Sequence, residues 1–224
     1  MPPRIERVLG QWLASGARGI GQVLISTQGD AFALCHREDE KRDEWELFRS
    51  PNDAIEIARC DDAGRYRRLK TAPTLRHGWR LEVANLTELR LALDGFYPGR
   101  LAALAAWEAH RLTTTPLRAT LNRQSGMYRV AARISDHEID ALVGRFCRSQ
   151  GGAPGCLRTI LWARDETKAR PSFRLPLDKF IAPLDQTGRG DNVMPLLCQE
   201  ACALLVAEAR KVVKGDSGVV NRES

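Results

Sequence analysis

The sequence lacks the features that mark membrane proteins and small secreted proteins. No apolar run approaches the roughly 18 residues that a membrane-spanning helix needs. Residues 1–7 lead into an amphipathic pattern and not into a signal peptide. Six cysteines in 224 residues are too few for a disulfide scaffold. We therefore expect a cytoplasmic protein that does not use a membrane.

Nucleotide-binding loops and catalytic groupings are also missing. No glycine-rich loop follows a predicted strand, so nothing supports nucleotide binding. Ser135 and Glu138 form a predicted helix cap and not a catalytic pair. The histidines are dispersed along the chain: His36, His77, His110 and His137. The sequence therefore gives no positive sign of an enzyme.

Concentrated positive charge and aromatic residues are scarce as well. The net charge is +6, which permits an acidic partner. However, the basic residues are scattered arginines, and only 6% of the residues are aromatic. Without a dense basic block with interleaved aromatics, the sequence does not favour nucleic acid as the partner. No pattern indicates an oligomeric state.

What the sequence does contain predicts an α+β protein that divides near residue 84. Residues 1–84 should form a small α+β module, and Asn52 should cap a short helix that starts at Asp53. Helical spacing covers 5–13, a hairpin joins 22–27 to 31–36, and further strands are expected at 45–48, 66–70 and 79–83.

The second part, residues 85–214, should be mainly helical, and residues 215–224 should be a disordered tail. Thr115 and Pro116 have the N-cap and N1 pairing of a helix start. Ser135 opens a capping box, and the helix that follows it should end at Cys147.

Four cysteines in this second part are the candidate site: Cys147, Cys156, Cys198 and Cys202. Cys198 and Cys202 are four residues apart, so on one helix they would share a face. The glycines between Cys147 and Cys156 would let the backbone wrap closely around a ligand. Four converging thiolates suit an iron–sulfur cluster or a structural zinc ion. Cys35 and Cys60 have no cysteine neighbour and are expected to be ordinary residues.

Two segments that contain these cysteines resemble a known family. Cys156-Leu-Arg-Thr-Ile-Leu-Trp162 and Met194-Pro-Leu-Leu-Cys198-Gln-Glu-Ala-Cys202 are similar to the four-cysteine [4Fe–4S] domain that accompanies CbiX-type sirohydrochlorin cobaltochelatases. The resemblance covers residues 85–214, and the first module is similar to the stabilising domain of such proteins. Gln199 and Ala201 stand where that family has prolines, and the chelatase domain has no counterpart in this chain.

The resemblance implies that Cys147, Cys156, Cys198 and Cys202 bind a [4Fe–4S] cluster. The function we expect is an accessory or redox protein linked to tetrapyrrole or cobalamin biosynthesis, whose partner is a redox protein or an enzyme of that pathway. One alternative is a structural four-thiolate zinc protein that acts as an interaction module. Another is a metal-free helical binding domain that uses its basic surface.

Overall fold

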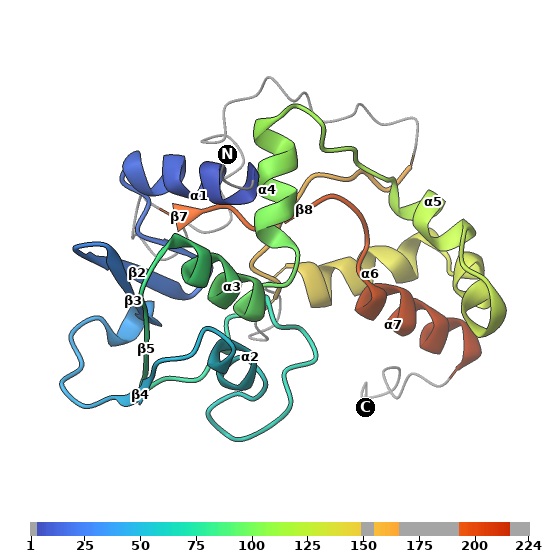
Figure 1. Ribbon diagram of the computed structural model, residues 1–224. Coiled ribbons are helices and arrows are strands. Elements are labelled where there is room, and N and C mark those ends of the chain that lie inside the picture. The colour runs from blue at the N-terminus through green and yellow to red at the C-terminus, as the bar shows by residue number, and fades with distance from the viewer. Residues whose placement is uncertain (1–3, 149–154, 166–192, 216–224) are drawn as a thin grey trace. The chain divides into compact units, whose positions relative to one another are not determined.

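The computed structural model describes residues 4–148, 155–165 and 193–215 and confirms an α+β protein (Figure 1). The chain divides into two compact units. Unit 1 consists of residues 1–112, 157–159 and 173–197, and unit 2 of residues 113–156, 160–172 and 198–224. Unit 1 therefore extends beyond residue 84, where the sequence predicts the first module to end. The predicted tail at 216–224 lies outside the described residues.

Unit 1 is built on a mixed sheet of six strands in the order β4-β5-β3-β2-β1-β7. The strands are β1 (Gly19–Ile20), β2 (Val23–Gln28), β3 (Ala31–His36), β4 (Glu46–Phe48), β5 (Trp79–Val83) and β7 (Val193–Met194). The predicted hairpin is formed by β2 and β3, with Val23 opposite His36 and Gln28 opposite Ala31. The edge pairs β4–β5 and β1–β7 are parallel, and the inner pairs are antiparallel.

The described residues of unit 1 also form the α-helices α1 (Arg4–Ala14), α2 (Asp53–Ile57), α3 (Leu86–Phe96) and α4 (Arg100–Glu108). Helix α3 packs against α1, α2 and α4 and contacts β3. Its side chain Phe96 stacks on Trp79 of β5 with ring centroids 4.9 Å apart, and both rings are fully buried. Helix α3 begins where the Asn85 side chain accepts the Glu88 N–H at 3.0 Å, so a local cap fixes its start.

A tight turn between β1 and β2 depends on a buried tyrosine. Gly21 has φ +55°, and a Cβ added there would lie 2.6 Å from the Tyr97 hydroxyl. That hydroxyl accepts the Gln22 N–H at 2.9 Å, and the Gln22 side chain in turn accepts the Leu75 N–H at 2.9 Å. Burial raises the pKa of Tyr97 to about 12, so the hydroxyl stays neutral. The turn therefore requires glycine and is fixed by hydrogen bonds to distant segments.

Two local predictions in unit 1 are wrong. The Asn52 side chain makes no capping hydrogen bond to α2. Residues 66–70 form no strand; Tyr66 makes only an isolated bridge to Cys60. The physical reason is the adjacent Arg67, whose buried guanidinium donates to Ala58 O, Lys70 O, Ala72 O and Thr74 Oγ1. A loop that wraps around a buried cation cannot also present its backbone to a sheet.

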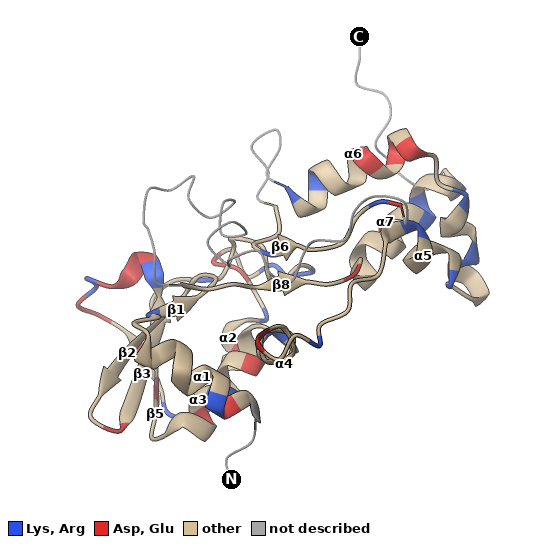
Figure 2. Cartoon of the chain, turned by 90° about the horizontal axis from the view of Figure 1, so that it is seen from above, with Lys and Arg blue, Asp and Glu red and all other residues tan. Residues whose placement is uncertain are grey.

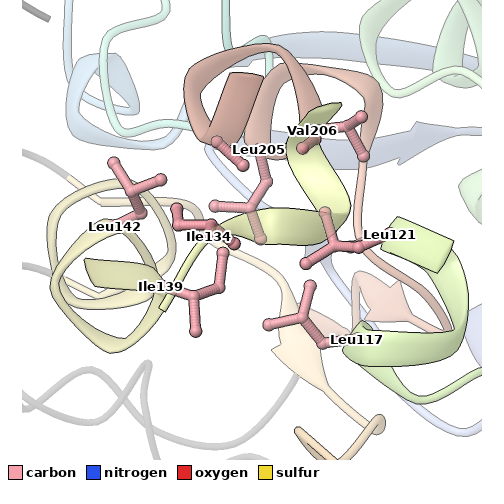
Figure 3. Close-up of a cluster of buried hydrophobic side chains, with 10 residues drawn as sticks. Leu117, Leu121, Ile134, Ile139, Leu142, Leu205 and Val206 are labelled. Carbon is pink, nitrogen blue, oxygen red and sulfur yellow. The ribbon is translucent and has the colours of Figure 1, made fainter. Parts of the chain in front are cut away.

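Unit 2 is mainly helical, as predicted. Its elements are α5 (Leu117–Asn122), the 3-10 helix η2 (Gly126–Arg133), α6 (Asp136–Cys147) and α7 (Ala203–Lys214). Their apolar side chains form one buried cluster, which includes Leu121, Ile139 and Leu205 (Figure 3). A separate two-stranded sheet pairs β6 (Thr159–Ile160) with β8 (Leu197–Cys198).

The ends of α6 follow the sequence closely. Ser135 and Glu138 form the predicted capping box, and the helix ends at Cys147. Acidic side chains lie in its first turn and Arg145 in its last turn, as the helix dipole favours (Figure 2). The start of α5, which precedes α6 in the chain, was predicted less well, because Pro116 and not Thr115 occupies its N-cap position and makes no side-chain cap.

Candidate metal centre

The best-defined part of the candidate site is the sulfur of Cys198. This residue ends β8, is 7% exposed, and its carbonyl accepts the Leu161 N–H at 2.9 Å. The indole N–H of the half-buried Trp162 donates to Cys198 Sγ at 3.3 Å. The thiol itself donates to Glu200 O at 3.2 Å. A thiolate that binds iron gives up the second contact, whereas the Trp162 N–H remains suited to a negatively charged sulfur.

Cys202 lies at the N-cap position of α7. Its backbone is extended there, and the Val206 N–H donates to its carbonyl at 3.2 Å. The N-terminus of a helix carries a partial positive charge, which favours a thiolate.

The expectation that Cys198 and Cys202 share one helix face is wrong. Cys198 is in a strand, Cys202 precedes a helix, and the three residues between them form a fixed connection. Gln199 O accepts the Thr115 N–H at 2.9 Å, Glu200 pairs with Arg123 at 2.5 Å, and Ala201 is buried in the apolar cluster. These anchors, and not helical periodicity, set the positions of the two sulfurs.

Cys147 and Cys156 complete the predicted set. Cys147, the last residue of α6, packs against the same apolar cluster as Cys202 and Trp162. Cys156 is half-buried and also belongs to unit 2. Of the three glycines predicted to wrap a ligand, Gly151 and Gly152 lie outside the described residues, and Gly155 is buried. All four predicted ligands therefore belong to one compact unit.

The spacing of the sulfurs bears on the choice of metal. A zinc ion with four thiolates at about 2.3 Å needs sulfurs that are about 3.8 Å apart. An iron–sulfur cluster tolerates wider spacing because each cysteine binds a different iron atom.

The two remaining cysteines lie in unit 1. Cys35 is in β3, and Cys60 makes the isolated bridge to Tyr66. Burial, with a further contribution from the Asp39 charge, raises the pKa of Cys35 to about 11. The raised pKa disfavours the thiolate, which is the form that binds a metal ion. Neither residue belongs to the unit that contains the other four.

Comparison with protein families agrees with this division. Residues 7–111 match the model of the DR2241 stabilising domain. Residues 109–211 match the model of a 4Fe-4S iron–sulfur cluster binding domain. The two matches together span residues 7–211. Its cofactor is a [4Fe–4S] cluster. The match favours the cluster over the four-thiolate zinc alternative.

A solved structure is similar over most of the chain. It is the structure of DR2241 from Deinococcus radiodurans, described as a multi-domain protein with structural similarity to chelatases and two additional novel domains. The identity is 29%, the TM-score 0.72, and the match covers 94% of this chain. The chain spans only 41% of the length of that protein. No curated protein is significantly similar to the chain.

Sequence reasoning named the four cysteines but missed the side chains that support them. Trp162 was quoted as part of a motif, but its hydrogen bond to a sulfur 36 residues away appears only in the fold. Arg123 and Glu200 had no signal in the sequence.

Among the described residues, none of the helices has the length and apolar character needed to cross a bilayer.

Proposed function

We propose that Cys147, Cys156, Cys198 and Cys202 hold the [4Fe–4S] cluster and that the chain acts as an accessory or redox protein. The observation that carries the ligand assignment is the Trp162 N–H bond to Cys198 Sγ at 3.3 Å. A neutral donor aimed at a buried cysteine sulfur is the arrangement that stabilises a metal-bound thiolate. When bound, the cluster supplies a site for one-electron transfer.

The two helix ends at the site have opposite electrostatic effects. Cys202 at the start of α7 gains from the positive end of the helix dipole, whereas Cys147 at the end of α6 faces the negative end. Arg145 and Arg148, both exposed, flank Cys147 in the sequence. Their charges offset the unfavourable dipole. They would also favour the approach of an acidic redox partner, and that approach should weaken as salt is added.

The link to tetrapyrrole or cobalamin biosynthesis is the finer part of the proposal. It is supported by the similarity to DR2241, which is described as similar to chelatases. The chain covers less than half of that protein, so we propose a role beside such an enzyme and not its catalytic activity. The partner would be a tetrapyrrole-pathway enzyme or the redox protein that serves it.

The ligand assignment is tested by anaerobic purification of the chain and of four single Cys→Ser variants. Iron and acid-labile sulfide should be present in the parent chain and fall sharply in each variant. Cys60→Ser is the matched control and should keep its iron. Zinc in place of iron in the parent chain, or full iron content in the Cys198→Ser variant, would contradict the assignment.

The redox role is tested separately on the cluster-loaded chain. Reductive titration followed by electron paramagnetic resonance should reveal a paramagnetic reduced state. A cluster that stays silent down to the lowest accessible potentials would leave only a structural role. Retention of iron in that experiment would still support the four ligands, so the two parts of the proposal can fail independently.

A further inference from the structure

A second group of metal-binding side chains lies in unit 1, in the DR2241 stabilising domain. His36, Asp39 and His77 each offer one ligand atom, and these atoms all lie within 4.8 Å of one another. Strand pairing brings them together, because β3 ends at His36 and pairs with β5 in a register that sets Cys35 opposite Arg80. Asp39 follows within the short 3-10 helix η1 (Arg37–Asp39).

His36 is fully buried, and one of its two ring nitrogens makes no hydrogen bond to the described residues. Its Nδ1 accepts the Glu38 N–H at 3.2 Å. Its Nε2 has no hydrogen-bond partner among the residues that the structure describes. Burial, together with the neighbouring His77, lowers the pKa of His36 to about 4. The ring is therefore neutral at physiological pH, which is the form that binds metal ions.

Asp39 is a buried carboxylate whose two oxygens have different surroundings. Oδ2 accepts the Gly78 N–H at 2.7 Å, which fixes the orientation of the group. Oδ1 lies 3.2 Å from His77 Nδ1. Burial raises the pKa of Asp39, but the hydrogen bonds from Gly78 and His77 outweigh burial and lower it overall. The carboxylate is thus ionised and oriented toward the histidine.

His77 is the member of the group that is partly exposed to solvent, and two further carboxylates lie near its ring. Its side chain is 34% exposed, and its ring centroid lies 3.9 Å from that of His36. On the other side of the ring, Nε2 lies 4.0 Å from a Glu38 carboxylate oxygen and 3.8 Å from one of Asp62. When Nδ1 binds a metal ion, the ring proton must be on Nε2, which is the nitrogen that faces these two negative charges.

We propose that His36, Asp39 and His77 bind a divalent first-row transition-metal ion, for which Zn²⁺ is the best-matched probe. Two imidazoles and one carboxylate are a common donor set for such ions, and open positions are left for water or a further ligand. The ion would link the end of β3 to the segment before β5. It belongs to a different unit from the four cysteines, so this site does not depend on the cluster assignment.

Metal binding has one local consequence at His36. For Nε2 to bind the ion, the ring proton must move to Nδ1, and Nδ1 then no longer accepts the Glu38 N–H. The amide of Glu38 should therefore lose protection from hydrogen exchange when the ion binds. This readout reports on the His36 ring itself and does not depend on any variant.

The test uses the full chain with its cluster in place, so that the cysteines are already occupied. Titration with Zn²⁺ should show one additional ion. X-ray absorption at the zinc edge should show only nitrogen and oxygen neighbours at about 2.0–2.2 Å and no sulfur at about 2.3 Å. His77→Ala and Asp39→Asn should each weaken zinc binding by about 100-fold or more, since even changes to the partners of ligands weaken metal binding by about 10–100-fold.

The matched control is His137→Gln, which removes an exposed histidine from the first turn of α6 in unit 2. Zinc affinity should be unchanged in this variant. Sulfur in the zinc shell of the parent chain, or equal zinc affinity in the parent chain and His77→Ala, would overturn the proposal. His77 is on the surface of its unit, so circular dichroism should confirm that His77→Ala remains folded.

Discussion

The hydrogen bond from Trp162 to Cys198 Sγ gives the sharpest prediction. Trp162→Phe removes the indole N–H but keeps an aromatic ring against the apolar cluster of unit 2. The reduced cluster carries one more negative charge than the oxidised cluster, so a donor to sulfur stabilises the reduced form more. Loss of the donor should therefore lower the reduction potential.

The size of the shift follows from the strength of one bond. A hydrogen bond to a charged group contributes about 1.5–3 kcal/mol. We take the added electron to be shared equally over the four cysteine sulfurs. The free energy of this one hydrogen bond then differs between the two oxidation states by about a quarter of its value, about 0.4–0.8 kcal/mol. For a one-electron reduction, a free-energy difference of about 1.4 kcal/mol corresponds to a potential difference of about 59 mV. The potential should fall by about 15–35 mV.

The assay is a reductive titration of both proteins in the same buffer, monitored by electron paramagnetic resonance. The control is Trp12→Phe, which removes an indole N–H that donates to Glu108 in unit 1. This control should leave the potential unchanged. A shift of Trp162→Phe that is no larger than that of the control, with iron content equal in both, would refute the role of this bond.

Three further outcomes are expected. Cys202→Ser should lower the iron content and the melting temperature together, because a cluster adds binding free energy only to the folded chain, whereas Cys35→Ser should change neither. Tyr97→Phe should lower the free energy of unfolding by about 1–3 kcal/mol in urea, because the buried Gln22 N–H loses its acceptor. Acid should destabilise unit 1, because folding lowers the pKa of His36 from 6.5 to about 4. As the pH falls from 6.5 to 4, the unfolded chain binds a proton that the folded chain does not. The free energy of unfolding, measured in urea at a series of pH values, should therefore decrease by up to about 3 kcal/mol over this range.

Each of these outcomes has a contradicting result. Equal iron loss in the Cys202 and Cys35 variants would show that the ligands are misassigned. An unchanged urea midpoint for Tyr97→Phe would mean that water replaces the hydroxyl. For the pH effect, His36→Leu should flatten the slope between pH 6.5 and pH 4. An equally steep slope in this variant would assign the acid sensitivity to other groups.

The sequence alone determined the features that depend on neighbours along the chain. Ser135 and Glu138 are three residues apart, so the capping box and the start of α6 follow from local geometry. Two strand-like runs on either side of the turn at residues 28–30 predict the hairpin of β2 and β3. The cysteine segments predicted the cofactor through their resemblance to a four-cysteine [4Fe–4S] domain, because four thiolates by themselves suit zinc as well.

Only the tertiary structure decided which side chains from distant parts of the chain come together. A spacing of four residues fits a helix, but Cys198 is in a strand because β6 supplies hydrogen-bond partners that a local pattern cannot show. The loop around Arg67 formed in place of a predicted strand because its carbonyl partners come from both sides of that residue in the sequence. His36 and His77 looked dispersed, being 41 positions apart in the sequence, and the β3–β5 pairing places their rings in contact. Contacts between distant segments depend on the packing of the whole chain, and residue spacing does not contain that information.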